Sequence, residues 1–263
     1  MLGSKTVLLA FDLDKTIVTA DYTLPSAIAD AIHRARDKGH QVSVLTGRPL
    51  AATTDFLEQL GVDAYYSVNH GSYVVGLEGA VLRQAALSEA ETAAILKPYL
   101  NHPDIEFSSV LGDTLYVRDP SHERWHWAHT DNRNVAVFDA DAGRNADKLV
   151  FLAAGRGPEI AEHVRSLYPE LILYPWEEDY LEVTAAKSDK GSALNLIAAE
   201  LNIPQSEVVA FGDGPNDITM LDWAAHAVAV GDGAYEDLLA LADEHIAGPE
   251  DLGVKDWLEE NIL

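Results

Sequence analysis

Short apolar runs alternate with longer mixed stretches over the first quarter of the chain. Pro25 opens the first mixed stretch, and Gly39 and Gly61 follow the ends of the two, as is typical of helix boundaries. Strand–helix–strand alternation of this kind predicts an α/β fold with a parallel sheet. The expected elements are strands over residues 6–10, 42–45 and 64–68 and helices over residues 25–38 and 50–60.

The pattern changes character in the middle of the chain, which reads as an inserted α/β cap domain over residues 82–186. The flanking parts, 1–81 and 187–263, are expected to form one discontinuous core domain, in which the strand–helix alternation resumes after Lys190. The elements expected in the cap are helices over 88–100 and 159–168 and strands over 114–117, 148–153 and 171–174; those expected after it are a helix over 192–201, a strand over 208–211 and a helix from Ile218.

The first apolar run ends in two carboxylates, Asp12 and Asp14. Alternate residues of a strand point the same way, so both acids are expected to face one spot. Two carboxylates so close repel each other unless a cation or a proton relieves them. The pair suits a bound hard cation and a carboxylate nucleophile that attacks phosphorus, although a strand-end turn capped by Asp has the same letters.

Three further segments carry groups that could act on a phosphate. Residues 212–217 read Gly-Asp-Gly-Pro-Asn-Asp after an apolar run, letters that also fit an ordinary turn. Thr46, Gly47 and Arg48 follow another apolar run, and a hydroxyl beside helix N-terminal amides is an anion cradle. Lys190 precedes a helical run and supplies a compact positive charge. In open α/β sheets ligands bind beyond the carboxyl ends of the strands, where these groups would lie.

With these motifs in this order, the sequence resembles the haloacid dehalogenase (HAD) superfamily, specifically its Cof-like sugar-phosphatase branch with a type IIB cap. The resemblance covers nearly the whole chain and implies a Rossmann-like α/β core, with helices on both faces of its sheet, plus the inserted cap. The matching motifs are Asp-Leu-Asp-Lys-Thr at 12–16, Leu-Thr-Gly-Arg at 45–48, Asn-His-Gly at 69–71, Lys-Gly-Ser-Ala-Leu at 190–194 and Gly-Asp-Gly-Pro-Asn-Asp-Ile-Thr-Met-Leu at 212–221.

The resemblance implies an Mg²⁺-dependent phosphatase that hydrolyses a small phosphorylated metabolite, expected to be a sugar phosphate. Asp12 would attack phosphorus and form an aspartyl phosphate, and Asp14 would act as general acid and base. Phosphate and substrate would be held by Leu13, Thr46, Gly47, Arg48, His70, Lys190 and Asn216, and Mg²⁺ by Asp12, Asp14, Asp213 and Asp217.

Two other functions are compatible with the same architecture. A phosphosugar mutase or phosphotransferase is the alternative, because an aspartyl phosphate can pass to a sugar hydroxyl instead of water. A catalytically idle metabolite-binding regulator is the third, and the presence of Asp12, Asp14, Lys190 and Asp213 argues against it.

The sequence departs from the family pattern at two places. Lys15 stands where the branch usually carries glycine, and Asp232-Gly233 stands where it usually carries Asn-Ala. In the cap, residues 125–129 read Trp-His-Trp-Ala-His and could stack on a substrate or form an ordinary packed loop. His70 lies on a loop after the third expected strand, where substrate contact is expected.

The composition of the chain limits which molecules it is expected to bind. Formal net charge is −25, from 43 acids against 18 bases, so binding to nucleic acid or to an anionic membrane is not expected. The acidity reads as a solvated surface tuned for solubility. The chain contains no cysteine, and its N-terminal apolar stretch is too short for a signal peptide or a membrane span. A cytoplasmic monomer or homodimer is therefore the expectation.

Overall fold

The computed structural model describes residues 6–130, 133–177 and 179–263. The chain divides into two compact units. The core unit comprises residues 1–47, 54–83 and 189–263, and the cap unit comprises residues 48–53 and 84–188. The short segment 48–53, expected in the core, therefore groups with the cap unit. That the two parts are domains in the folding sense remains a prediction.

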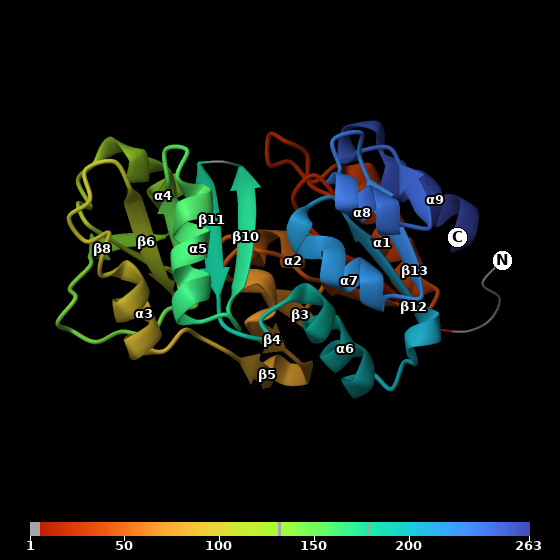
Figure 1. Ribbon diagram of the computed structural model, residues 1–263. Coiled ribbons are helices and arrows are strands. Elements are labelled where there is room, and N and C mark those ends of the chain that lie inside the picture. Colours follow the sequence, from red (N-terminus) through yellow and green to blue (C-terminus); the bar gives the residue numbers. More distant parts are fainter. Residues whose placement is uncertain (1–5, 131–132, 178) are drawn as a thin grey trace. The chain divides into compact units, whose positions relative to one another are not determined.

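The core unit is built on one parallel sheet of five strands in the order β14-β13-β12-β1-β2. Figure 1 labels two of these strands, β12 and β13. Such a sheet is buried on both faces, so its strands are almost continuously apolar. The strands are β1 (Leu8–Phe11), β2 (Gln41–Val44), β12 (Val208–Gly212), β13 (His226–Val230) and β14 (Glu244–Ile246).

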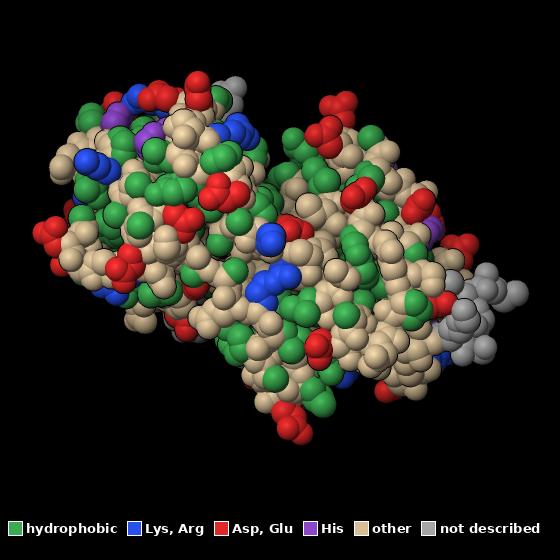
Figure 2. Space-filling model, turned by 60° about the horizontal axis from the view of Figure 1, so that its bottom comes forward, with side chains coloured by type: hydrophobic (Ala, Val, Ile, Leu, Met, Phe, Trp, Pro, Cys, Tyr) green, Lys and Arg blue, Asp and Glu red, His purple; other side chains and the backbone are tan. Residues whose placement is uncertain are grey.

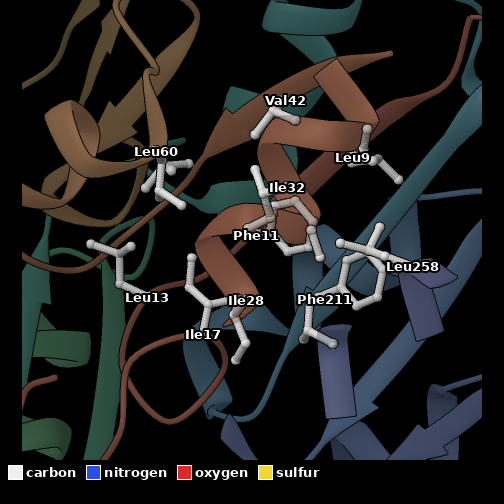
Figure 3. Packing of buried hydrophobic residues seen from close by; sticks show 14 of the residues in the cluster. Leu9, Phe11, Leu13, Ile17, Ile28, Ile32, Val42, Leu60, Phe211 and Leu258 are labelled. Carbon is white, nitrogen blue, oxygen red and sulfur yellow. The ribbon is translucent and has the colours of Figure 1, made fainter. Parts of the chain in front are cut away.

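Alternation along the strands divides the apolar side chains between two cores. Leu9 and Phe11 of β1 face one layer, in which Phe11 stacks on Phe211 with ring centroids 4.7 Å apart (Figure 3). Leu8 and Ala10 face the other layer. The first layer contains α1 (Ser26–Asp37), α2 (Thr54–Leu60) and α9 (Gly253–Asn261), and the second contains α6 (Lys190–Glu200), α7 (Ile218–Trp223) and α8 (Glu236–Leu241).

Helix α1 shows how sequence spacing produces this packing. Its buried side chains, Ile28, Ala31, Ile32 and Ala35, recur at the spacing of one helix face. Pro25 is its N-cap residue, and Arg34 and Arg36 lie in its last turn, where positive charge complements the helix dipole.

The third expected strand is not part of the parallel sheet. β3 (Tyr66–Val68) meets β2 only through an isolated parallel bridge between Leu45 and Ser67. It pairs antiparallel with β4 (Tyr73–Val75), and β5 (Val81–Gln84) completes a small three-stranded sheet. The carboxyl end of β3 nevertheless lies beside that of β2, because the N–H of Thr46 donates to Ser67 O over 2.9 Å.

The cap unit contains a six-stranded, mainly antiparallel sheet in the order β10-β11-β9-β6-β7-β8. Helices α3 (Glu89–Leu96) and α5 (Gly157–Leu167) share one apolar core with this sheet. The strands are β6 (Glu106–Leu111), β7 (Thr114–Val117), β8 (Asn134–Val137), β9 (Lys148–Leu152), β10 (Ile172–Glu177) and β11 (Tyr180–Thr184), and the remaining helix is α4 (His126–Thr130).

The sequence pattern missed three of these cap strands, β6, β8 and β11. β11 shows the reason, because Glu182 interrupts its apolar pattern. Its carboxylate is buried and lies 2.6 Å from the ammonium of Lys148 on β9, which compensates the charge. A neighbour distant in sequence thus makes a polar strand residue tolerable.

Helices begin and end near the expected residues, with two exceptions. The helix expected over 88–100 already ends at Leu96. The helix expected over 50–60 starts only at Thr54. Residues 50–53 form turns instead, in which Thr53 Oγ1 donates to the carbonyl of Pro49 over 2.9 Å. In the part of the chain that the structure describes, no helix has the length and apolarity needed to cross a membrane. Figure 2 shows acidic side chains spread over the visible face rather than gathered in one patch.

Candidate active site

Strand β1 brings Asp12 to the carboxyl edge of the core sheet. The N–H of Asp12 donates to Phe211 O over 3.0 Å, so pairing with β12 continues one residue beyond the last residue of β1. Asp12 is only 4% exposed. Its carboxylate is therefore held in a fixed, largely water-free position.

The chain turns immediately after Asp12. The carbonyl of buried Leu13 accepts from the N–H groups of Ile17 and Val18, at 3.0 and 2.8 Å. Because β1 ends at Phe11, strand alternation does not govern Asp14, which is half-buried in this turn. Asp14 still lies close enough for its charge to contribute to raising the pKa of Asp12.

Lys15 adopts a left-handed backbone conformation, with φ of 58°, and its side chain is exposed. Glycine is the residue that takes this conformation without steric cost. The lysine that replaces the glycine usual at this position in the family therefore strains the backbone, because its Cβ is disfavoured in a left-handed conformation.

Lys190 is the first residue of α6 and is fully buried. The helix start is fixed by Asp189, whose side chain accepts from the N–H of Ser192 over 2.8 Å. The ammonium of Lys190 donates to Asp12 Oδ1 at 2.5 Å and to Asp217 Oδ1 at 2.6 Å. One cation thus joins carboxylates from two separate strand ends.

Asp217 holds the loop that follows β12. Its Oδ2 accepts from the N–H groups of Asp213 and Gly214, at 3.1 and 3.0 Å. Its Oδ1 accepts from Lys190. Both oxygens of Asp217 are therefore engaged in holding the loop and the lysine, and Asp12 and Asp213 are the carboxylates better placed to bind a cation.

The electrostatics of this cluster are unbalanced. Burial raises the pKa of Asp12 well above its usual value, and Asp217, Asp213 and Asp14 add to the rise against the opposing effect of Lys190. Burial and the charge of Asp217 raise the pKa of Asp213 to about 7. Burial alone lowers the pKa of Lys190, but the two carboxylates outweigh it and raise that pKa. The site holds more negative charge than its lysine compensates.

The donor set fits a divalent cation. Oxygens of Asp12, Asp213 and Asp217 lie within 4.8 Å of one another, and carboxylate oxygens are the ligands that hard cations such as Mg²⁺ prefer. A bound cation would also offset the burial and the mutual repulsion that together raise the pKa values of Asp12 and Asp213. The hydroxyl of Thr16 lies 3.4 Å from Asp213 Oδ1 and helps to orient it.

Thr46 and Gly47 follow β2 at the same edge of the core sheet. Thr46 is fully buried, and its carbonyl accepts from the N–H of His70 at 3.0 Å. Arg48, by contrast, groups with the cap unit, and its guanidinium donates to the carbonyl of Ala52 over 3.2 Å.

The turn formed by residues 69–71 lies against the Thr46–Gly47 loop and the loop that carries Asn216. His70 is 1% exposed, and its Nδ1 lies 3.2 Å from the side-chain nitrogen of Asn216. Asn69 is 4% exposed, and its side-chain oxygen has no hydrogen-bond partner among the residues that the structure describes. Sequence reasoning did not single out Asn69; its place inside the Asn-His-Gly motif was the available signal.

The two tryptophans of the cap segment 125–129 differ in their exposure to solvent. Trp125 is buried and packs with Val117 and Val150 of the cap sheet. Trp127 is 47% exposed, with the guanidinium carbon of Arg133 5.7 Å from its ring centroid. The side chain of His129 lies outside the described residues.

A hollow of about 390 Å³ lies at the opposite edge of the core unit, where β2 begins. Basic groups in its wall are occupied by the carboxyl end of α2. His33 Nε2 lies 2.9 Å from Gln59 O, and Arg36 donates to Leu60 O over 3.1 Å. His33 and Arg36 thus cap the carboxyl end of α2, and none of the residues lining this hollow belongs to the carboxylate cluster.

Comparison with known proteins identifies the class to which this fold and site belong. Residues 9–258 match the haloacid dehalogenase-like hydrolase family, and the chain belongs to that family. It is 24% identical to the putative phosphatase YxeH of Bacillus subtilis, over 97% of this chain and 98% of that protein. It is 25% identical to the 5-amino-6-(5-phospho-D-ribitylamino)uracil phosphatase YitU of the same organism, over 98% of each.

The fold matches solved structures over the same extent. The HAD subclass IIB sugar phosphatase BT4131 superposes with a TM-score of 0.82 at 24% identity, covering 97% of this chain and 98% of that one. The expected α/β fold with a type IIB cap is confirmed, and so is the identification of the chain as a phosphatase-type hydrolase of this family.

Proposed function

We propose that this protein hydrolyses the phosphomonoester of a small phosphorylated metabolite, with Mg²⁺, through a phosphorylated Asp12. The observation that carries the proposal is the contact of Lys190 with Asp12 Oδ1, 2.5 Å long, at the carboxyl end of β1. A buried carboxylate oriented by a lysine, beside the second acid Asp213, is the arrangement that nucleophilic attack on a phosphate dianion requires.

In the first step we assign the attack to Asp12 Oδ2, because Oδ1 accepts from Lys190. A bond forms between this oxygen and phosphorus, while the bond from phosphorus to the leaving oxygen breaks. Asp14, in the turn that follows, gives its proton to the leaving alkoxide. Lys190 moderates the repulsion between the carboxylate and the incoming phosphate.

In the second step water attacks the phosphorus of the aspartyl phosphate. Asp14 takes the proton of the water, the bond between phosphorus and Asp12 breaks, and inorganic phosphate is released. The Thr46 hydroxyl and the Gly47 amide are assigned to the phosphate oxygens through both steps, with Asn216 at the neighbouring loop.

Asp12 and Asp213 would hold the Mg²⁺, with the carbonyl oxygen of Asp14 as a further donor. When bound, the cation supplies charge neutralisation for the transferring phosphoryl group. Asp217 is assigned to orienting Lys190 and the loop, because both of its oxygens already accept hydrogen bonds.

We propose a sugar phosphate or a similar polar phosphomonoester as the substrate. The support is the shared fold with a subclass IIB sugar phosphatase and the similarity to YitU, whose named substrate carries a phosphorylated ribityl chain. Cytoplasmic localisation remains a prediction.

The test is release of inorganic phosphate from a panel of phosphorylated sugars and cofactors, with and without Mg²⁺. Asp12→Asn should abolish release, while Asp30→Asn, an exposed acid on α1, should leave it unchanged. Chelator should remove the activity and Mg²⁺ should restore it. Release by a folded Asp12→Asn protein, beyond slow deamidation, contradicts the nucleophile, and isomerisation of a sugar phosphate without net release favours a mutase.

A further inference from the structure

The turn formed by residues 69–71 has an unusual backbone conformation next to the candidate site. Asn69, His70 and Gly71 have φ values of 48°, 58° and 100°, so three consecutive residues are left-handed. Side chains other than glycine rarely adopt this conformation, and it persists only where surrounding contacts impose it. The contacts of this turn therefore identify what it serves.

The first contact is with the Thr46–Gly47 loop. His70 N–H donates to Thr46 O at 3.0 Å. The imidazole ring covers Gly47 so closely that a Cβ added to Gly47 would lie 2.3 Å from His70 Cε1. No side chain larger than hydrogen fits at residue 47 while this ring is present.

The second contact is with the loop after β12. His70 Nδ1 lies 3.2 Å from Nδ2 of Asn216. An amide nitrogen can only donate, so Nδ1 is the acceptor and the proton of a neutral ring is on Nε2. Asn216 is 5% exposed, so this bond is made away from water.

The third contact is with the residue before Lys190. A Cβ added to Gly71 would lie 2.2 Å from the carbonyl oxygen of Asp189. Arg83 reinforces this junction, since its guanidinium donates to Ser192 Oγ on the first turn of α6 at 2.8 Å. One turn thus touches the three loops that carry Gly47, Asn216 and Lys190.

We infer that His70 is a positioning residue, which fixes the Asn216 amide and the Gly47 backbone relative to each other and does not itself touch the substrate. The inference rests on the proposed function, because it concerns the same phosphate site. It differs from the expectation of direct substrate contact at His70, since the ring is 1% exposed and occupied by Gly47 and Asn216.

Two substitutions of His70 separate the two contacts of its ring, and a third substitution elsewhere serves as a control. His70→Phe keeps a ring over Gly47 but removes the acceptor for Asn216. His70→Asn keeps an acceptor at the position of Nδ1 and tolerates the left-handed backbone. His226→Phe is the control, because His226 is the first residue of β13 and lies at the amino end of the strands, away from the carboxyl edge that carries the site.

The readouts are KM and kcat for p-nitrophenyl phosphate and the inhibition constant of inorganic phosphate, with thermal unfolding recorded for every variant. His70→Phe should raise KM and the inhibition constant about tenfold, the effect of one lost buried hydrogen bond, and change kcat less. His70→Asn should lie within about threefold of the wild type. His226→Phe should move neither constant, even if it lowers the unfolding temperature.

The decisive measurement is the double-mutant cycle with Asn216→Ala. If His70 acts through Asn216, His70→Phe should change the inhibition constant by less than about twofold in the Asn216→Ala background. Equal losses in both backgrounds would overturn the inference, as would losses that follow the unfolding temperature across all variants. A wild-type protein that releases phosphate but shows additive losses contradicts only this inference, whereas a wild type without turnover contradicts the proposed function as well.

Discussion

The ammonium of Lys190 lies 2.6 Å from Oδ1 of Asp217, and neither side chain is exposed to solvent. The second oxygen of Asp217 accepts from the backbone of the loop that carries Asp213. Asp217 is therefore a structural partner of the lysine, whereas burial and the charge of Asp217 both disfavour the ionised carboxylate of Asp213 and raise its pKa. The two acids of one motif are predicted to respond in opposite directions to the same substitution.

Asp213→Asn should stabilise the protein in chelator, by about 1 kcal/mol or ~2–4 °C, because it removes a half-buried charge from an over-negative cluster. Asp217→Asn should destabilise it by about 2–3 kcal/mol, because an amide cannot accept from both Lys190 and the loop N–H groups. Thermal unfolding in EDTA measures both. Shifts of the same sign would show that the two carboxylates have equivalent roles, and added Mg²⁺ should stabilise the Asp213→Asn protein less than the wild type.

Asp14→Asn should separate the two chemical steps. A p-nitrophenolate leaves without much protonation, whereas a sugar alkoxide needs a proton, so the variant should lose about 10²–10⁴-fold more on a sugar phosphate. With p-nitrophenyl phosphate, a burst of nitrophenol followed by a slow steady rate is expected, because hydrolysis of the aspartyl phosphate also needs a base. Stopped-flow absorbance detects the burst. Equal losses on both substrates without a burst would assign Asp14 to the cation or to structure.

Lys15→Gly should be more stable than Lys15→Ala by about 1 kcal/mol, because only glycine relieves the left-handed conformation at φ 58°. Both substitutions remove the same charge, so their difference isolates the backbone. Denaturant unfolding of the pair measures it. A Gly variant no more stable than the Ala variant would mean that the greater freedom of glycine in the unfolded chain cancels the relief of strain.

The stability of the protein should depend on pH through Asp147 of the cap unit. Burial raises its pKa, and its Oδ2 accepts from the N–H of Gly112 at 2.8 Å. A carboxyl with a raised pKa contributes its full stability below the unfolded-state pKa of about 4 and loses it as pH rises through the folded-state pKa. Asp147→Asn keeps an acceptor for Gly112 and should be more stable than the wild type at pH 7, by less than about 1 kcal/mol because the group is partly solvated.

The advantage of Asp147→Asn should shrink as the pH falls toward 4. Thermal unfolding between pH 4 and 8 measures it, with the exposed Asp104→Asn as a control in the same unit. A difference between Asp147→Asn and the wild type that does not change with pH would show that the charge of Asp147 is not the cause.

Local pattern located several elements of the core, although the sequence pattern yielded no ranges for β13, β14, α8 and α9. Helix α1 and strand β12 lie within a residue of their expected ends, because apolar spacing and capping residues act over a few positions. The same reading failed where a polar residue is neutralised from elsewhere, as Glu182 is by Lys148, or where a local turn competes with a helix, as at residues 50–53.

Which chemical groups stand at the carboxyl ends of the core strands follows from local sequence, since strand, turn and acid are adjacent in the chain. How those groups pair depends on the folded arrangement of distant segments. Lys190 contacts Asp12 across 178 residues of sequence, and His70 contacts Asn216 across 146. The same is true of Oδ1 of Asp217, which accepts from Lys190, and of the left-handed 69–71 turn, because both depend on packing between segments that no local propensity brings together.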